Sequence, residues 1–185
     1  MALERLCVYC GSGAGLDGAF ADAARRLGEA MGELGISLVY GGGRAGLMGA
    51  VADGVLSRGG HVRGVITRQL VDMETAHTGL AQLDVVETMH QRKMMMVSIA
   101  EGFVALPGGY GTLDELFEAL AWLQLGIHDR PVGLLNTGGF YDGLIGWLRG
   151  VEGRGFLRVP VDRALVVARE PGALLDAMSS AACGR

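Results

Sequence analysis

The run of residues 107–115, PGGYGTLDE, combines the residue types of a phosphate-binding loop with an acid that follows closely. It comes after the apolar residues 103–106, which predict a buried strand, and leads into the helical pattern of residues 111–125. Glycine lets backbone N–H groups approach a phosphate without a Cβ in the way, and a helix N-terminus adds unpaired donors. An ordinary glycine-rich turn is the alternative, since neither the Walker A nor the G-x-G-x-x-G spacing is present. The length and context of the run favour phosphate binding by Gly108, Gly109, Tyr110, Gly111 and Thr112.

Glu115 lies one helical turn beyond Thr112, so its carboxylate is able to face the same side as the loop. A carboxylate beside a phosphate repels it and does not help the phosphate to bind. It therefore suits another task, such as a general base or the stabiliser of a developing cation. The alternative, which would be preferred for this residue taken alone, is a first-turn glutamate that complements the helix dipole.

Arg92 and Lys93 form a basic pair in a predicted helix at residues 88–100. Neighbouring residues of a helix point about 100° apart, so the two side chains need not serve one ligand. The planar guanidinium of Arg92 suits phosphate or ribose oxygens. An exposed, solvated basic pair is the alternative.

Two more glycine-rich segments follow predicted strands. Gly41, Gly42 and Gly43 come after residues 37–40, and the shorter Gly11-Ser12-Gly13 comes after residues 6–10. Such turns permit the close approach of a nucleotide, although a role in packing or turning alone competes with that interpretation. Ser12, Gly42 and Gly43 are taken as ligand-contact candidates.

These segments need a scaffold that brings them together, and the hydrophobic pattern predicts one. Short apolar runs alternate with amphipathic stretches, which is typical of a parallel sheet covered by helices on both faces. We therefore expect an α/β fold with a doubly wound, mostly parallel, Rossmann-like sheet in a single domain of residues 1–185. Ligands bind such sheets at the carboxyl ends of the strands, where the glycine-rich segments lie. The predicted strands are residues 6–10, 37–40, 62–66, 83–86, 103–106, 132–135 and 165–168; the predicted helices are residues 17–34, 47–57, 88–100, 111–125, 140–150 and 171–182; residues 67–82 are predicted to be a mobile connection.

Charge and apolar content exclude several classes of partner. The net charge of −4 gives no broad positive surface for nucleic acid. No apolar run reaches the length of about 20 residues that crosses a bilayer, and the N-terminus does not have the pattern of a signal peptide. We expect no nucleic-acid partner, no membrane partner and a cytoplasmic location.

Cysteine and histidine spacing gives little support for a metal. Cys7 and Cys10 form a C-x-x-C, but a spacing of three in a strand sends the side chains to opposite faces, and no second pair completes a zinc site. Core packing is favoured over redox or metal chemistry. The four histidines form no H-x-x-x-H pair. We expect neither a metal nor a cofactor.

Taken together, these motifs resemble the Lonely Guy (LOG) family of cytokinin-activating phosphoribohydrolases. The resemblance implies hydrolysis of the N-glycosidic bond of N6-substituted adenosine 5′-monophosphates to a free base and ribose 5-phosphate; some members also act on AMP. It covers most of the chain, from about Cys7 to Phe156. It rests on residues 8–12 (VYCGS), 39–43 (VYGGG), 46–49 (GLMG), 89–93 (MHQRK), 106–115 (LPGGYGTLDE), Trp122 and 124–128 (QLGIH).

The resemblance also implies roles for single residues. Arg92 and Glu115 would be the catalytic pair, and residues 108–112 would bind the 5′-phosphate. Glu74 matches a family glutamate in the nucleotide site by its spacing to Arg92, and Lys93 is a further substrate-binding candidate. Thr67 stands where the family often has proline, and Asp114 stands where glutamate is common.

The sequence also bears on assembly and on two alternative functions. The resemblance predicts a homodimer, as does apolar helical surface around Leu116, Leu120, Trp122 and Leu123; the alternative is that these residues cover the sheet. A non-hydrolytic nucleotide-binding or carrier protein would use the same loops without needing Glu115. A nucleoside-level hydrolase would not require the 5′-phosphate.

Overall fold

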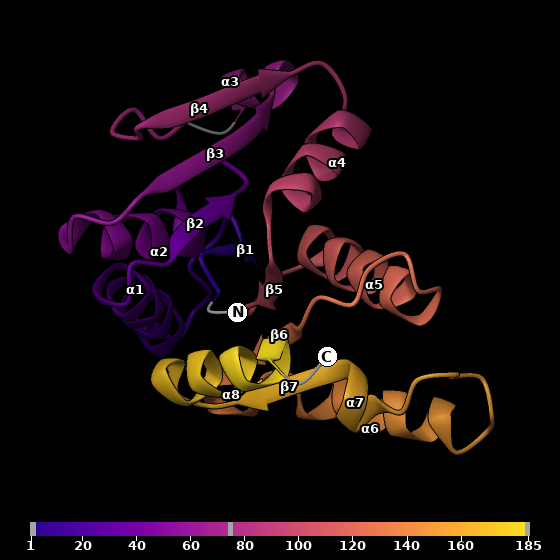
Figure 1. The fold of residues 1–185 in the computed structure, drawn as a ribbon. Helices are drawn as coiled ribbons and strands as arrows, with labels where there is room; N and C mark the ends of the chain where they lie inside the picture. Colours follow the sequence, from indigo (N-terminus) through magenta and orange to yellow (C-terminus); the bar gives the residue numbers. More distant parts are fainter. Residues whose placement is uncertain (1–2, 74–75, 184–185) are drawn as a thin grey trace.

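The computed structural model describes residues 3–73 and 76–183, whose strands form one sheet of seven parallel strands (Figure 1). The strand order is β4-β3-β2-β1-β5-β6-β7, and every neighbouring pair is parallel. The predicted doubly wound, Rossmann-like α/β fold is confirmed. The strands are β1 (Arg5–Tyr9), β2 (Ser37–Tyr40), β3 (Val62–Thr67), β4 (Gln82–Val86), β5 (Gly102–Ala105), β6 (Val132–Leu135) and β7 (Leu165–Ala168).

The strand order reverses between β1 and β5. The chain builds outward from β1 to β4, then returns to place β5 on the other side of β1 and continues to β7. The carboxyl ends of β1 and β5 therefore diverge into loops on opposite faces, which opens a crevice at this switch point. Residues 10–13 follow β1 and residues 106–112 follow β5 at this crevice, and both segments contain the glycines noted in the sequence.

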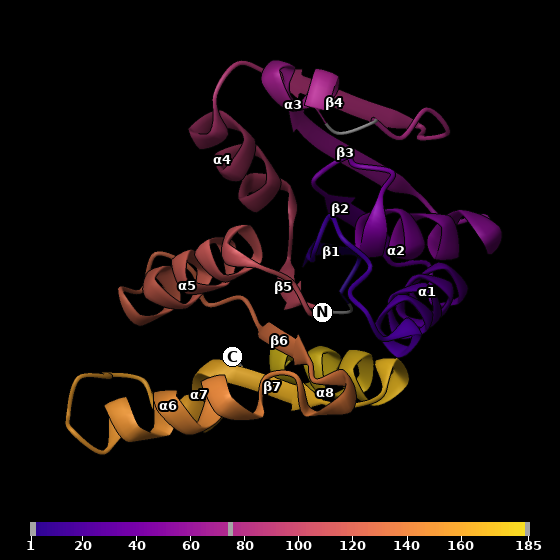
Figure 2. The ribbon, with the colours of Figure 1, turned by 180° about the vertical axis from the view of Figure 1, so that it is seen from behind.

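Helices cover the sheet in two layers (Figures 1 and 2). One apolar core holds side chains of α1 (Gly18–Glu33), α2 (Gly46–Ser57) and α8 (Pro171–Cys183), packed on one face of the sheet. The other core holds side chains of α4 (Met89–Ile99), α5 (Tyr110–Gln124) and α6 (Asp142–Glu152). Cys7 belongs to this second core and Cys10 packs against the first, so the prediction that they point to opposite faces is confirmed.

The predicted strands and long helices appear within two residues of their expected bounds. The prediction of a mobile connection is wrong at Arg68–Met73, which forms the short helix α3. Six residues are too few to display a helical period in the sequence. The Thr67 hydroxyl accepts a hydrogen bond from the Leu70 N–H at 3.3 Å, which caps that turn. The pattern also missed α7 (Val161–Ala164) and the 3-10 turn η1 (Thr137–Gly139).

Candidate active site

A cavity of about 380 Å³ lies at the switch point, lined by the end of β1, by Gly41 after β2 and by residues of the helices α2, α4 and α5. Its wall combines glycine backbone, one buried ion pair and several apolar side chains. The lining residues are Val8, Tyr9, Cys10, Gly11, Ser12, Gly41, Met48, Met89, Arg92, Met96, Gly109, Tyr110, Gly111, Thr112, Asp114 and Glu115.

The phosphate-loop candidates surround the start of α5. Gly109 is the N-cap and has no side chain to accept the N–H groups of the first turn, so these donors are available to a ligand. Gly109, Tyr110, Gly111 and Thr112 all line the cavity. Gly108 does not line the cavity. It packs against Thr112 and Gly11, because an added Cβ would lie 2.1 Å from Thr112 Oγ1 and 2.9 Å from the Gly11 nitrogen. Gly108 therefore permits close packing of the loop on the end of β1.

Alanine at Gly108 and alanine at Gly109 should differ in their effect on folding. Gly108→Ala should lower the free energy of unfolding by about 1–3 kcal/mol, because the new methyl overlaps the Thr112 side chain and the Gly11 backbone. Gly109→Ala meets no atom within 4 Å and should leave the melting temperature unchanged. Because Gly109 lines the cavity at the start of α5, a methyl group there would hinder the approach of a phosphate, and we expect AMP to bind about tenfold more weakly. Thermal melts and calorimetric titration of both variants check this; equal effects on melting would contradict it.

Arg92 is held rigidly although it carries a charge. Its side chain is buried, and the residue is 7% exposed. Nε donates to the Val65 carbonyl at 2.9 Å, and Nη2 donates to the Gly41 carbonyl at 3.1 Å. Only glycine at position 41 leaves room for this, since a Cβ there would lie 2.1 Å from Nη2. The ends of β2 and β3 thus fix the guanidinium and leave Nη1 turned toward Glu115.

Glu115 projects from the first turns of α5 into the cavity. Its side chain is 14% exposed, and Oε1 lies 4.0 Å from Arg92 Nη1. Burial raises the pKa of the Glu115 carboxyl from 4.5 to about 7, while the charge of Arg92 lowers it. A carboxyl with a pKa near neutrality suits proton transfer or the stabilisation of a transient positive charge. This burial distinguishes Glu115 from an exposed dipole-complementing glutamate.

Lys93 does not line the cavity, although it is adjacent to Arg92. Its ammonium lies 3.1 Å from Asp114 and 3.0 Å from Glu118, both on α5. The structure therefore places Lys93 in a link between α4 and α5. Asp114, where the resemblance expected glutamate, is one of its two partners.

Of the other predicted site residues, one lines the cavity and two support the surrounding structure. Ser12 lines the cavity, whereas Gly42 and Gly43 do not. The Gly42 carbonyl accepts from the His77 N–H at 3.0 Å, and Gly43 forms a β-bridge with Ala76. These glycines thus hold the segment that follows Glu74. Glu74 itself lies outside the described residues.

Sequence reasoning missed an apolar wall of the cavity. Met48 from α2 and Met89 and Met96 from α4 line it together with Arg92. The spacing of residues 89, 92 and 96 places them on one face of a helix, a signal that was present in the sequence. Thioethers give a flexible, polarisable surface suited to a nucleobase or an apolar substituent.

Metal ligands are not gathered at this site. Within the described ranges, no group of three or more histidine, cysteine, aspartate or glutamate side chains is placed to hold an ion. Within the same ranges, no helix is long and apolar enough to cross a membrane.

Solved structures share the fold. A molybdenum cofactor carrier protein from Chlamydomonas reinhardtii superposes with a TM-score of 0.75 over 97% of this chain and 98% of that chain, at 19% identity. A molybdenum cofactor binding protein from Rippkaea orientalis gives a TM-score of 0.71 over 97% of this chain and 98% of that chain, at 20% identity. At such identities the likeness establishes the fold alone.

Sequence relatives are much closer. The chain is 46% identical over 165 residues to the cytokinin riboside 5′-monophosphate phosphoribohydrolase LOG of Oryza sativa, covering 89% of this chain and 68% of the relative. It is 45% identical over 164 residues to LOG1 of Arabidopsis thaliana, covering 89% and 76%. Residues 48–178 match a family model described as "Possible lysine decarboxylase". The chain therefore belongs to this family, the one that contains the LOG proteins.

Proposed function

We propose that the protein hydrolyses the N-glycosidic bond of N6-substituted adenosine 5′-monophosphates, and of AMP, to free base and ribose 5-phosphate. The observation that carries the proposal is the buried Arg92–Glu115 pair, 4.0 Å apart, in a cavity also lined by the glycine-rich start of α5. Relatives named as cytokinin riboside 5′-monophosphate phosphoribohydrolases support it. Residues 1–185 would act as one functional domain.

In this mechanism the glycine-rich loop binds the phosphate, and the Arg92–Glu115 pair acts on the glycosidic bond. Gly109, Gly111 and Thr112 anchor the 5′-phosphate and so fix the ribose near Glu115. Glu115 stabilises positive charge at C1′ or activates the attacking water as the glycosidic bond breaks. Arg92 stays protonated, so it orients the nucleotide and assists departure of the base by hydrogen bonding or charge. Water supplies the hydroxyl at C1′ and the proton that the base takes.

Release of free base tests this function against its rivals. Purified protein incubated with isopentenyladenosine 5′-monophosphate or AMP should yield free base, while adenosine, which lacks the 5′-phosphate, should yield little. Tight nucleotide binding without any base release would instead favour a carrier. Equal turnover of adenosine and AMP would favour a nucleoside hydrolase.

The description "lysine decarboxylase" in the family model does not fit this chain. Pyridoxal phosphate enzymes hold the cofactor through a lysine Schiff base. Lys93 is the single lysine of the sequence, and its ammonium is paired with both Asp114 and Glu118. These two carboxylates favour the protonated amine, which is not a nucleophile.

The pKa of Glu115 predicts the pH dependence of activity. Because burial raises that pKa to about 7, the carboxylate form dominates only above neutrality. If the carboxylate is the active form, kcat/KM for AMP should rise about tenfold per pH unit below pH 7 and level off above it. Initial rates from pH 5 to 9 check this. A profile that is flat between pH 5 and 8 would contradict the role of Glu115.

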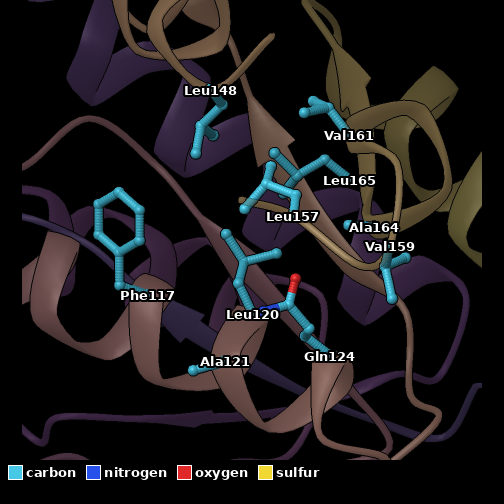
Figure 3. Close-up of a pocket in the computed structure, with 10 residues that line it drawn as sticks. All are labelled: Phe117, Leu120, Ala121, Gln124, Leu148, Leu157, Val159, Val161, Ala164 and Leu165. Atoms are coloured by element: carbon cyan, nitrogen blue, oxygen red, sulfur yellow. The ribbon is translucent and has the colours of Figure 1, made fainter. Parts of the chain in front are cut away.

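We further propose a cytoplasmic homodimer. Leu116 of α5 is buried in the core, so for this residue the covering role holds, but apolar side chains remain exposed nearby. Phe117 of α5 is 36% exposed and Trp147 of α6 is 59% exposed, with their rings in edge contact. Phe117 also lines an apolar pocket of about 180 Å³ between α5 and residues 157–165 (Figure 3). Light scattering at micromolar concentration should give twice the chain mass; a monomer would contradict the dimer.

A further inference from the structure

The segment that follows β6 contacts the base of the phosphate-loop candidate. Tyr141, which is 1% exposed, donates a hydrogen bond from its hydroxyl to the Leu106 carbonyl at 2.6 Å. Leu106 directly precedes residues 107–112. Tyr141 does not line the cavity, so any effect it has on a ligand passes through the backbone at Leu106.

The peptide at Leu106 is held from two sides. Its N–H donates to the Tyr9 carbonyl at 2.9 Å, and the next carbonyl, that of Pro107, accepts from the Gly11 N–H at 3.1 Å. The paired residues of β5 and β6 end at Ala105 and Leu134. Leu106 follows the last paired residue of β5, and its carbonyl accepts from the Tyr141 hydroxyl.

Tyr141 is itself fixed by neighbours at the ends of β6 and β7. Its N–H donates to Asn136 Oδ1 at 2.7 Å, and Asn136 Nδ2 donates to Asp142 Oδ1 at 2.6 Å. The other Asp142 oxygen lies 3.6 Å from Arg169 Nη2. Hydrogen bonds and a loose surface ion pair thus connect the carboxyl end of β7 with the loop that leaves β5.

We infer that Tyr141 is a positioning residue that sets the phosphate-binding loop for its ligand, through the Leu106 carbonyl. The inference rests on the proposed function insofar as residues 109–112 bind phosphate. Backbone donors at a helix start bind an anion well only when they are already directed at it, because ordering them on binding costs affinity. A hydrogen bond at the strand end, where the loop departs, restrains that direction.

Tyr141→Phe tests the inference because it removes the hydroxyl and keeps the buried ring. Loss of one hydrogen bond should weaken binding of ribose 5-phosphate by about three- to tenfold, and raise KM for AMP similarly, with a much smaller change in kcat. Inhibition by adenine, which has no phosphate, should be unchanged. KM and inhibition constants do not depend on the fraction of protein that is folded, so a loss of stability alone would not move them.

Tyr40→Phe is the matched control. Tyr40 is also fully buried, but its hydroxyl has no hydrogen-bond partner within the described part of the chain. The control should leave ribose 5-phosphate binding as it is in the wild type. An equal weakening in both variants would overturn the inference.

Calorimetric titration with ribose 5-phosphate keeps this test separate from hydrolysis. If the wild type binds ribose 5-phosphate but releases no base, the proposed function fails, and weaker binding by Tyr141→Phe still supports the positioning role. The inference is overturned, while hydrolysis stands, if Tyr141→Phe binds ribose 5-phosphate as tightly as the wild type does. It is also overturned if the variant's affinity for adenine falls as much as its affinity for ribose 5-phosphate. A wild type that binds no ribose 5-phosphate overturns the inference.

Discussion

Glu115→Gln should lower kcat for AMP by about 10²–10⁴-fold, the range typical of losing a general acid or base. The amide keeps the size of the carboxyl but neither takes a proton nor carries the charge that stabilises a cation at C1′. Nucleotide affinity should change little, because the proposed phosphate site is the start of α5 and does not include Glu115. Single-turnover rates and calorimetric binding of AMP separate the two effects. Near-normal turnover would remove Glu115 from the chemistry.

The same variant should be more stable than the wild type at alkaline pH. The folded pKa of about 7 lies above the ordinary 4.5, so the folded state binds the proton more tightly than the unfolded chain does. Stability is therefore lost as the pH rises from about 4.5 to about 7, and the loss is complete above that window. Glu115→Gln should melt higher than the wild type at pH 8, and this advantage should shrink toward pH 5. A constant difference across that range would contradict the raised pKa.

Glu118→Gln is the control for Glu115. Glu118 is one turn further along α5, pairs with Lys93 and does not line the cavity. Its replacement should leave turnover within about twofold of the wild type, because Glu118 does not line the cavity and Lys93 keeps its ion pair with Asp114. A similar collapse of activity in both variants would point to damage to α5 rather than to lost chemistry.

Arg92→Lys should lower kcat/KM for AMP by about 10²-fold or more, although the charge is kept, because misplacing a catalytic group costs that much. One ammonium cannot reproduce the guanidinium, which reaches the Val65 and Gly41 carbonyls and Glu115 at once. The two carbonyls would lose donors in a buried site, so the melting temperature should also fall. Steady-state kinetics and thermal melts check both effects. Wild-type activity in Arg92→Lys would show that the fork geometry is not required.

The effect of the Arg92 charge on the Glu115 pKa can be measured separately, through the pH dependence of the rate. Arg92 lowers the pKa of Glu115, so its removal in Arg92→Ala should shift the residual pH–rate profile upward from about pH 7, whereas Arg92→Lys should shift it less. Arg63→Lys is the matched control, since Arg63 pairs with Asp84 on β4, away from the cavity. It should change neither the rate nor the profile. Identical profiles in Arg92→Ala and the wild type would contradict the coupling.

The sequence alone determined the scaffold and the place of the site. Strand and helix patterns are local, and a few rules of chirality and crossover leave only a small set of sheets for an alternating pattern. Glycine-rich segments at the ends of three predicted strands then had to lie at one edge. The glycine pattern also marked residues 108–112 as the phosphate-loop candidate, whereas Arg92 and Glu115 were named as a catalytic pair only through the family resemblance. The weak periodicity of residues 67–82 hid α3, because six residues do not show a period.

Tertiary structure decided what each side chain does at that edge. Arg92 and Lys93 are neighbours in sequence, yet the backbone carbonyls of Val65 and Gly41 hold the first in the cavity, and carboxylates of α5 hold the second outside it. Gly108 supports the loop, whereas Gly109 lines the cavity. The raised pKa of Glu115 and the contact of Tyr141 with Leu106 depend on burial and on pairings between distant segments. No local pattern encodes them, because both arise only when the strands and helices are packed together.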